Sequence, residues 1–141
     1  MFAACRTSSL RQIDTEDIVC ATVAYADGAI GVIDATTTAY PGYRERIDLA
    51  GELGTAVLEA EGLEVHCLGR EPLQVAGSSA GGGGADPMAF SHEPHRLLLE
   101  DFIDALKTGR APICDAREGR RSVALIDAIY RSAQSGGFET P

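Results

Sequence analysis

The sequence lacks any long hydrophobic run. Its longest apolar stretches, at residues 29–33 and 56–58, are far shorter than the roughly 20 residues that a membrane-spanning helix needs. The first residues contain no basic segment before an apolar core, so a secretory signal peptide is not indicated. We therefore expect a cytoplasmic protein that does not interact with membranes.

Positive charge is scarce. Twelve Lys and Arg residues oppose 21 Asp and Glu residues, which gives a net charge of −9 at pH 7. Such a surface repels phosphate backbones and anionic lipid headgroups. We expect neither nucleic acid nor a membrane surface as a partner.

Paired cysteines are also missing. The four cysteines are separated by 15, 47 and 47 positions, without a C-x-x-C pair, so the spacing does not fit a zinc site. We interpret them as reduced thiols and predict no metal site. They are Cys5, Cys20, Cys67 and Cys114.

Catalytic motifs are absent as well. The four glycines at 81–84 do not enter a helix directly and lack the Lys-Ser/Thr of a phosphate-binding loop, so a linker is favoured. His92 and His95 are three positions apart with Pro94 between them, whereas a zinc-protease helix spaces its histidines by four. We predict no catalytic and no cofactor-binding residue in this chain.

What is present fits one soluble domain, residues 1–141, with 45% hydrophobic and 23% charged residues. Glycine turns separate a series of short alternating segments, and Asp27-Gly28 predicts a hairpin with a type I′ turn. The expected strands are 2–6, 18–26, 29–39, 44–50, 55–59, 63–68 and 74–76.

Two helices are expected after a flexible glycine-rich loop at 77–87. The first, 93–108, tolerates Pro94 in its first turn and ends before Gly109. The second, 117–134, begins after Asp115 and ends before Gly136.

Strands followed by helices predict an α+β fold: a mostly antiparallel open β-sheet with the two helices packed on one face. The other face is then free for association. Because strand 18–26 carries apolar or neutral side chains on both sides, we expect a partner there, most simply a second copy of the chain.

The segment from Tyr40 to Arg46 is the candidate binding site. The hydroxyls of Tyr40 and Tyr43 and the guanidinium of Arg44 suit a polyhydroxylated or carboxylated small molecule. The alternative is a loop packed by tyrosine rings with its arginines in surface ion pairs. His95, at the helix entrance, is a further candidate substrate contact.

Several segments, in this order and spacing, resemble the C-terminal domain of the Gfo/Idh/MocA oxidoreductases, the glucose-fructose oxidoreductase and inositol dehydrogenase family. They cover nearly the whole chain. The matching segments are 26–35, 40–43, 47–56, His95, 101–106, 109–112, 118–121 and 128–133.

The resemblance implies a two-domain enzyme. An N-terminal Rossmann domain would bind NAD or NADP and supply a catalytic Lys, and an Asp-x-x-x-His motif would supply an acid–base His. This sequence has none of these motifs, so the resemblance implies a part downstream of the catalytic residues. Tyr43, Arg44 and His95 match positions near the substrate, and the open sheet matches a surface for subunit association.

Three functions follow as hypotheses. The leading one is the substrate-binding and oligomerisation domain of an NAD(P)-dependent oxidoreductase that acts on a sugar, polyol or cyclitol secondary alcohol and forms a homodimer or higher oligomer. The chain alone is then expected to be inactive. The alternative is a stand-alone, non-enzymatic dimeric module that binds a ligand or a protein. A small independent enzyme using His92 or His95 is the weakest.

Overall fold

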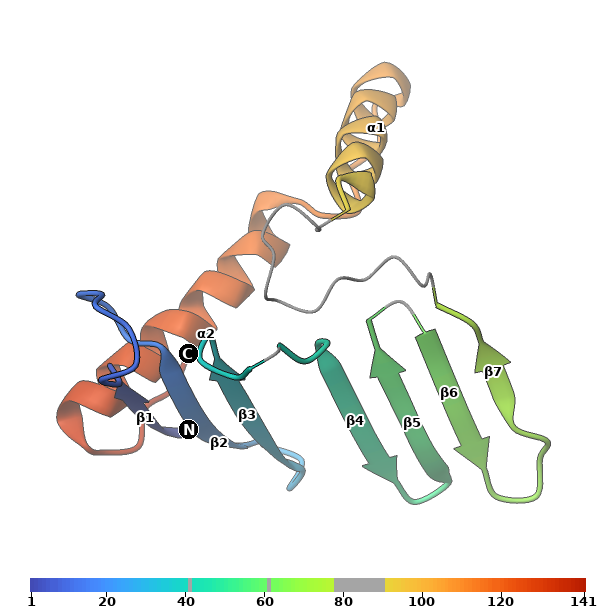
Figure 1. The fold of residues 1–141 in the computed structure, drawn as a ribbon. Helices are drawn as coiled ribbons and strands as arrows, with labels where there is room; N and C mark the ends of the chain where they lie inside the picture. The colour runs from blue at the N-terminus through green and yellow to red at the C-terminus, as the bar shows by residue number, and fades with distance from the viewer. Residues whose placement is uncertain (41, 61, 78–90) are drawn as a thin grey trace. The chain divides into compact units, whose positions relative to one another are not determined.

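The computed structural model describes residues 1–40, 42–60, 62–77 and 91–141. The chain forms two compact units, each with its own sheet (Figure 1). Unit 1 comprises Met1–Thr38 and Glu93–Pro141, and unit 2 comprises Ala39–His92. Most of the predicted glycine-rich loop, residues 78–87, lies outside the described residues.

Unit 1 contains an antiparallel sheet in the order β1 (Phe2–Arg6), β2 (Ile18–Ala24), β3 (Ile30–Thr36). The predicted hairpin at Asp27-Gly28 is confirmed, but the type I′ turn is wrong. Only Gly28 has a positive φ, of 93°, and its N–H donates to the Tyr25 carbonyl at 3.1 Å. The connection is a tight turn followed by one left-handed glycine, which also suits the twist of a hairpin.

Helix α2 (Ala116–Ser135) packs against β1. Both predicted caps are confirmed: the Asp115 carboxylate accepts from two N–H groups of the first turn, and Gly136 closes the helix with φ 66°. The small buried core lies between α2 and the inner side chains of the strands. Its members are Met1, Ala3, Ala21, Ala128 and Ile129.

Ser132 of α2 connects three parts of unit 1. Its fully buried hydroxyl accepts from the Ala3 N–H of β1 at 2.9 Å and donates to the Gly137 carbonyl at 2.6 Å. One side chain therefore satisfies a strand donor and a tail acceptor that would otherwise be left without partners.

Asp17 closes the loop between β1 and β2. Its buried carboxylate accepts from the Ser8 N–H at 2.7 Å and from the Ser8 hydroxyl at 2.6 Å, and these bonds lower the pKa of Asp17. Its backbone carbonyl accepts from Thr37 N–H at 3.0 Å and from the Thr36 hydroxyl at 2.9 Å. Asp17 thus joins this loop to the end of β3.

The face of this sheet opposite α2 carries exposed apolar side chains of β3. The Ile33 side chain points to the core. Because side chains alternate along a strand, those of Val32 and Ile30 point to the opposite face. Val32 is 78% exposed and Ile30 is 82% exposed. Two large apolar side chains therefore stand on the open face of β3.

Unit 2 is an antiparallel meander of four strands: β4 (Arg46–Gly51), β5 (Gly54–Glu59), β6 (Gly62–Cys67) and β7 (Leu73–Val75). The sequence predicted one sheet, whereas the strands form two separately hydrogen-bonded sheets. The alternation of side chains along a strand predicts which face each residue occupies, but not which strands pair with one another. The division into two sheets therefore could not be predicted from the sequence pattern.

The two faces of the unit 2 sheet differ in chemistry. One face carries Ile47, Leu49, Leu58, Leu63 and Val65, which the pairing register places on the same side. The other face carries the charged side chains described below. This segregation confirms the predicted alternation from Arg46 onward, whereas residues 44 and 45 of the predicted strand 44–50 precede β4.

Gly54 begins β5 where backbone segments meet closely. A Cβ atom at this position would lie 2.0 Å from the His66 carbonyl oxygen and 2.9 Å from Cys67 Cα. Only glycine allows the two strands to approach at this point.

Helix α1 (Glu93–Thr108) belongs to unit 1, as the predicted first helix. Among the described elements, α1 packs extensively against none of the strands and not against α2, so the predicted packing of both helices on one face of a sheet is seen for α2 only. None of the described helices is long and apolar enough to span a membrane. The four cysteines are free thiols, with Cys5 and Cys67 half-buried and Cys20 and Cys114 exposed.

Candidate functional site

The predicted site residues Tyr40, Tyr43 and Arg44 lie in unit 2, immediately before β4. Tyr40 is 90% exposed, Tyr43 is also exposed, and Gly42 between them has φ 103°. Among the described residues, none is hydrogen-bonded to the side chains of these three. Their two hydroxyls and one guanidinium are presented to solvent as free donors.

The fourth predicted residue, His95, belongs to unit 1. It lies in the first turn of α1 and is exposed. The structure therefore groups Tyr40, Tyr43 and Arg44 on one segment, and holds His95 on a separate element.

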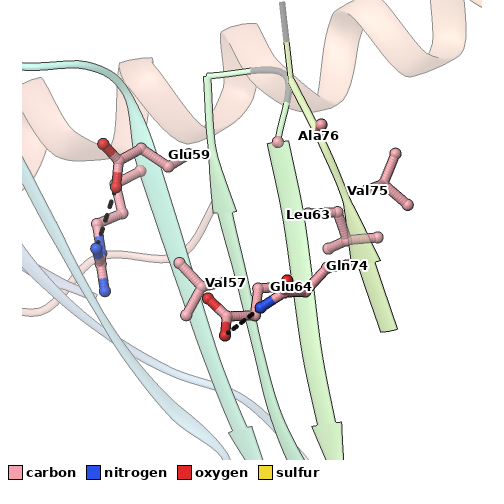
Figure 2. A pocket seen from close by; sticks show the side chains of 9 residues that line it. Val57, Glu59, Leu63, Glu64, Gln74, Val75 and Ala76 are labelled. Atoms are coloured by element: carbon pink, nitrogen blue, oxygen red, sulfur yellow. Dashed lines mark hydrogen bonds and ion pairs between the residues drawn. The ribbon is translucent and has the colours of Figure 1, made fainter. Parts of the chain in front are cut away.

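A shallow hollow of about 510 Å³ lies on the charged face of the unit 2 sheet. Its lining includes the first residue of β4, the strand that follows the segment with Tyr40, Tyr43 and Arg44. Figure 2 shows the side chains that line it, contributed by all four strands or the residues adjoining them. They are Arg46, Val57, Glu59, Gly62, Leu63, Glu64, Gln74, Val75 and Ala76.

Arg46 organises one side of this hollow. Its Nε donates to the two carboxylate oxygens of Asp48 at 2.9 and 3.1 Å, and Nη1 donates across the strands to Glu59 at 3.2 Å, as Figure 2 shows for Glu59. The hydrogen bonds that Arg46 donates to Asp48 lower the pKa of Asp48 and raise the pKa of Arg46. Both groups are therefore charged at neutral pH.

Glu64 organises the other side. Its Oε1 lies 2.6 Å from His66 Nε2 and accepts from Gln74 Nε2 at 3.3 Å. The hydrogen bond to His66, followed by that to Gln74, lowers the pKa of Glu64. A carboxyl held ionised in this way is an acceptor for hydroxyl groups and a poor proton donor at neutral pH.

The hollow can bind polar groups but shows no catalytic constellation. Its carboxylates are half-exposed and already paired, and no nucleophile lies beside a base among its lining residues. The described residues contain no group of three or more His, Cys, Asp or Glu side chains that could hold a metal ion.

Glu59, Glu64 and Gln74 share a face of the sheet with Arg46, which the sequence did not predict. The alternation of Arg46 and Asp48 placed those two on one face, which the structure confirms. The other three join them through the register Arg46↔Glu59, Val57↔Glu64 and Glu64↔Gln74. That register depends on turn geometry between strands, and so no local pattern marks the cluster.

Comparison with known proteins decides the family. Residues 2–139 match the Gfo/Idh/MocA family domain described as "Oxidoreductase family, C-terminal alpha/beta domain". This chain belongs to that family. The resemblance predicted from the sequence and the α+β fold are both confirmed.

Relatives of this Gfo/Idh/MocA domain are longer proteins. An uncharacterized protein, y4oX, from Sinorhizobium fredii is 29% identical over 129 residues, which cover 87% of this chain and 35% of that protein. The WlbA dehydrogenase from Bordetella pertussis, solved in complex with NADH and UDP-GlcNAcA, is 27% identical with a TM-score of 0.73. That match covers 99% of this chain and 41% of WlbA.

A further solved structure shares the fold at lower identity. An oxidoreductase from Agrobacterium radiobacter, in complex with NAD+, L-tartaric acid and magnesium, is 20% identical with a TM-score of 0.75, covering 96% of this chain and 41% of that one. The chain thus spans well under half the length of the relatives it matches.

Proposed function

We propose that this chain is the C-terminal substrate-binding and oligomerisation domain, residues 1–141, of a cytoplasmic NAD(P)-dependent oxidoreductase that acts on a secondary alcohol of a sugar, polyol or cyclitol. The observation that carries the proposal is the family match over residues 2–139. The NADH and nucleotide-sugar complex of WlbA, whose chain extends well beyond the matched part, supports the substrate class.

In this proposal NAD or NADP is bound by a Rossmann domain outside this sequence. The sequence itself offers no G-x-G-x-x-G turn after a strand, so its residues do not fit a dinucleotide. The cofactor would accept a hydride from the alcohol carbon while a base outside this chain takes the hydroxyl proton. This chain contributes binding and orientation of the substrate.

The proposed substrate contacts are Tyr40, Tyr43, Arg44 and His95. The tyrosine hydroxyls donate to and accept from sugar hydroxyls, and the Arg44 guanidinium pairs with a carboxylate or phosphate if the substrate carries one. Their exposure supports this role, because the described structure leaves these polar groups available to a ligand.

The experiment compares the complete gene product with the 141-residue chain. We expect NADH or NADPH formation with inositol, glucose or a nucleotide sugar from the complete protein only. Arg44→Gln in the complete protein should raise KM for an anionic substrate about tenfold, since a hydrogen bond to a charged group contributes about 1.5–3 kcal/mol. Turnover by the 141-residue chain alone would contradict the proposal.

Arg70→Gln is the matched control. Arg70 is an exposed arginine of the same unit, in the turn after β6, and KM should stay at the wild-type value. If both arginine variants raised KM equally, Arg44 would have no specific part in substrate binding.

A further inference from the structure

The turn between β2 and β3 contains the single Asp-Gly pair of the sequence, Asp27-Gly28. In such a pair the backbone nitrogen of the glycine can attack the carboxyl carbon of the aspartate, because glycine has no Cβ atom to obstruct the approach. Every other Asp precedes a residue that carries a side chain, and the sequence contains no Asn. The sequence therefore favours this reaction at residue 27 above all other positions.

The structure holds the two reacting groups together. The Asp27 Oδ1 atom accepts from the Ala29 N–H at 3.0 Å. The ring closed by this bond includes the Gly28 nitrogen, so the carboxyl group is folded back beside the Gly28 peptide. Asp27 and Gly28 are both exposed, and apart from chain neighbours no described heavy atom lies within 4 Å of the place where a Gly28 Cβ would stand. The approach of nitrogen to carboxyl carbon is therefore open.

One hydrogen bond holds the attacking nitrogen back. The Gly28 N–H donates to the Tyr25 carbonyl at 3.1 Å, and the Tyr25 N–H donates to the Ala29 carbonyl at 2.9 Å. The first bond must break before Gly28 can react. Exposed hairpin tips open at little cost in free energy, so the folded protein samples the open turn. All of these contacts lie within residues 25–29 and involve no other part of the chain.

We propose that Asp27 is a site of spontaneous modification, where the folded protein converts aspartate to isoaspartate through a cyclic imide with Gly28. The Gly28 nitrogen forms a bond to Asp27 Cγ, the Cγ–OH bond breaks, and the hydroxyl leaves as water with the amide proton. A water molecule then opens the imide. Addition at Cγ restores aspartate, whereas addition at the backbone carbonyl carbon breaks its bond to the Gly28 nitrogen and leaves isoaspartate. Water is the only other reactant, and the mass is unchanged.

The modification changes the hairpin itself. In isoaspartate the backbone runs through the Cβ and Cγ atoms, which adds one methylene group to the turn. The pairing of Ala24 with Ile30 adjoins this turn, and strand register in a hairpin is fixed by the length and type of its turn. Isoaspartate at residue 27 therefore loosens the end of the β2–β3 pair, where the exposed Ile30 side chain stands.

The test incubates the complete gene product at neutral pH in water labelled with heavy oxygen. We expect isoaspartate at residue 27, located by electron-transfer mass spectrometry, with one solvent oxygen incorporated. Asp14 is the internal control, because it is also exposed in a loop but precedes Thr15, whose branched side chain obstructs the attack. The rate at residue 27 should exceed that at Asp14 about tenfold or more.

Two variants extend the test. Asp27→Asn should lose ammonia through the same imide about tenfold or more faster than Asp14→Asn. Asp27→Glu should abolish the modification, because its longer side chain would have to close a larger ring. Equal rates at residues 27 and 14 would overturn the proposal. Reaction of Asp27→Asn in urea but not in the folded protein would overturn it too, since the closed turn would then keep the nitrogen from the carboxyl carbon.

Discussion

Two buried polar side chains contribute to the stability of unit 1 through their hydrogen bonds. Ser132 and Asp17 are its buried polar side chains among the described residues, and both are fully hydrogen-bonded. A buried polar group contributes little net stability when paired and costs much when its partner is removed. Substitutions at these two residues should therefore lower the stability of the fold measurably.

Ser132→Ala leaves the Ala3 N–H and the Gly137 carbonyl without their partner. We expect the free energy of unfolding to fall by about 1–3 kcal/mol, measured by urea denaturation. Ser122→Ala, at an exposed position of the same helix, is the control and should change it by less than about 0.5 kcal/mol. Equal losses would show that the Ser132 hydroxyl has no special role.

Asp17→Asn tests the pH dependence. The pKa of Asp17 is lowered in the folded state by its bonds to Ser8, so ionisation stabilises the fold above the unfolded pKa of about 3.9 and this contribution is lost as pH falls through the lower, folded pKa. The stability difference between wild type and Asp17→Asn should be constant from pH 7 to 5 and shrink towards pH 3, by urea denaturation.

Asp14→Asn, an exposed carboxylate in the same loop, should leave the free energy of unfolding close to the wild-type value at each pH. A stability difference for Asp17→Asn that persists unchanged at pH 3 would show that its charge is not what stabilises the loop.

At the scale of elements, the ends of strands and helices were predictable where one residue type is strongly favoured for a turn or a helix cap. Asp115 and Gly136 marked the ends of α2, and Asp27-Gly28 marked the hairpin. The type of turn was not predictable, because a glycine permits several turns and the choice depends on the flanking strands. The pairing of strands into two sheets, and with it the Arg46–Glu59 contact, depends on long-range packing.

Gly54→Ala tests the closest backbone approach in unit 2. The added methyl would collide with the His66 carbonyl, so we expect a loss of about 3 kcal/mol or more in stability, and faster hydrogen exchange in β5 and β6. Gly51→Ala is the control, because a Cβ atom at this position would lie 3.9 Å from its nearest neighbour, the Gly54 carbonyl oxygen, which is an ordinary contact distance. Similar losses in both variants would contradict the steric explanation.

For the whole molecule, the open face of the three-stranded sheet predicts self-association. Replacing Ile30 and Val32 with lysine should weaken dimerisation about tenfold or more by analytical ultracentrifugation, since two charges would have to be desolvated on the open face. Both side chains are exposed, so the fold itself should be unaffected. Leu10→Lys, at an exposed loop position, should leave association unchanged.

The order of the two units along the chain has a consequence for synthesis. Unit 2 is built from strands that follow one another directly, whereas unit 1 joins β1 to α2 across a separation of more than a hundred residues, as the Ala3–Ser132 bond shows. During synthesis, the unit 2 meander therefore leaves the ribosome complete and can form early. Unit 1 can form fully only after its last helix, α2, has been made. Nascent chains stalled after residue 92 and clear of the exit tunnel should show amide protection in β4–β6 and none in β1.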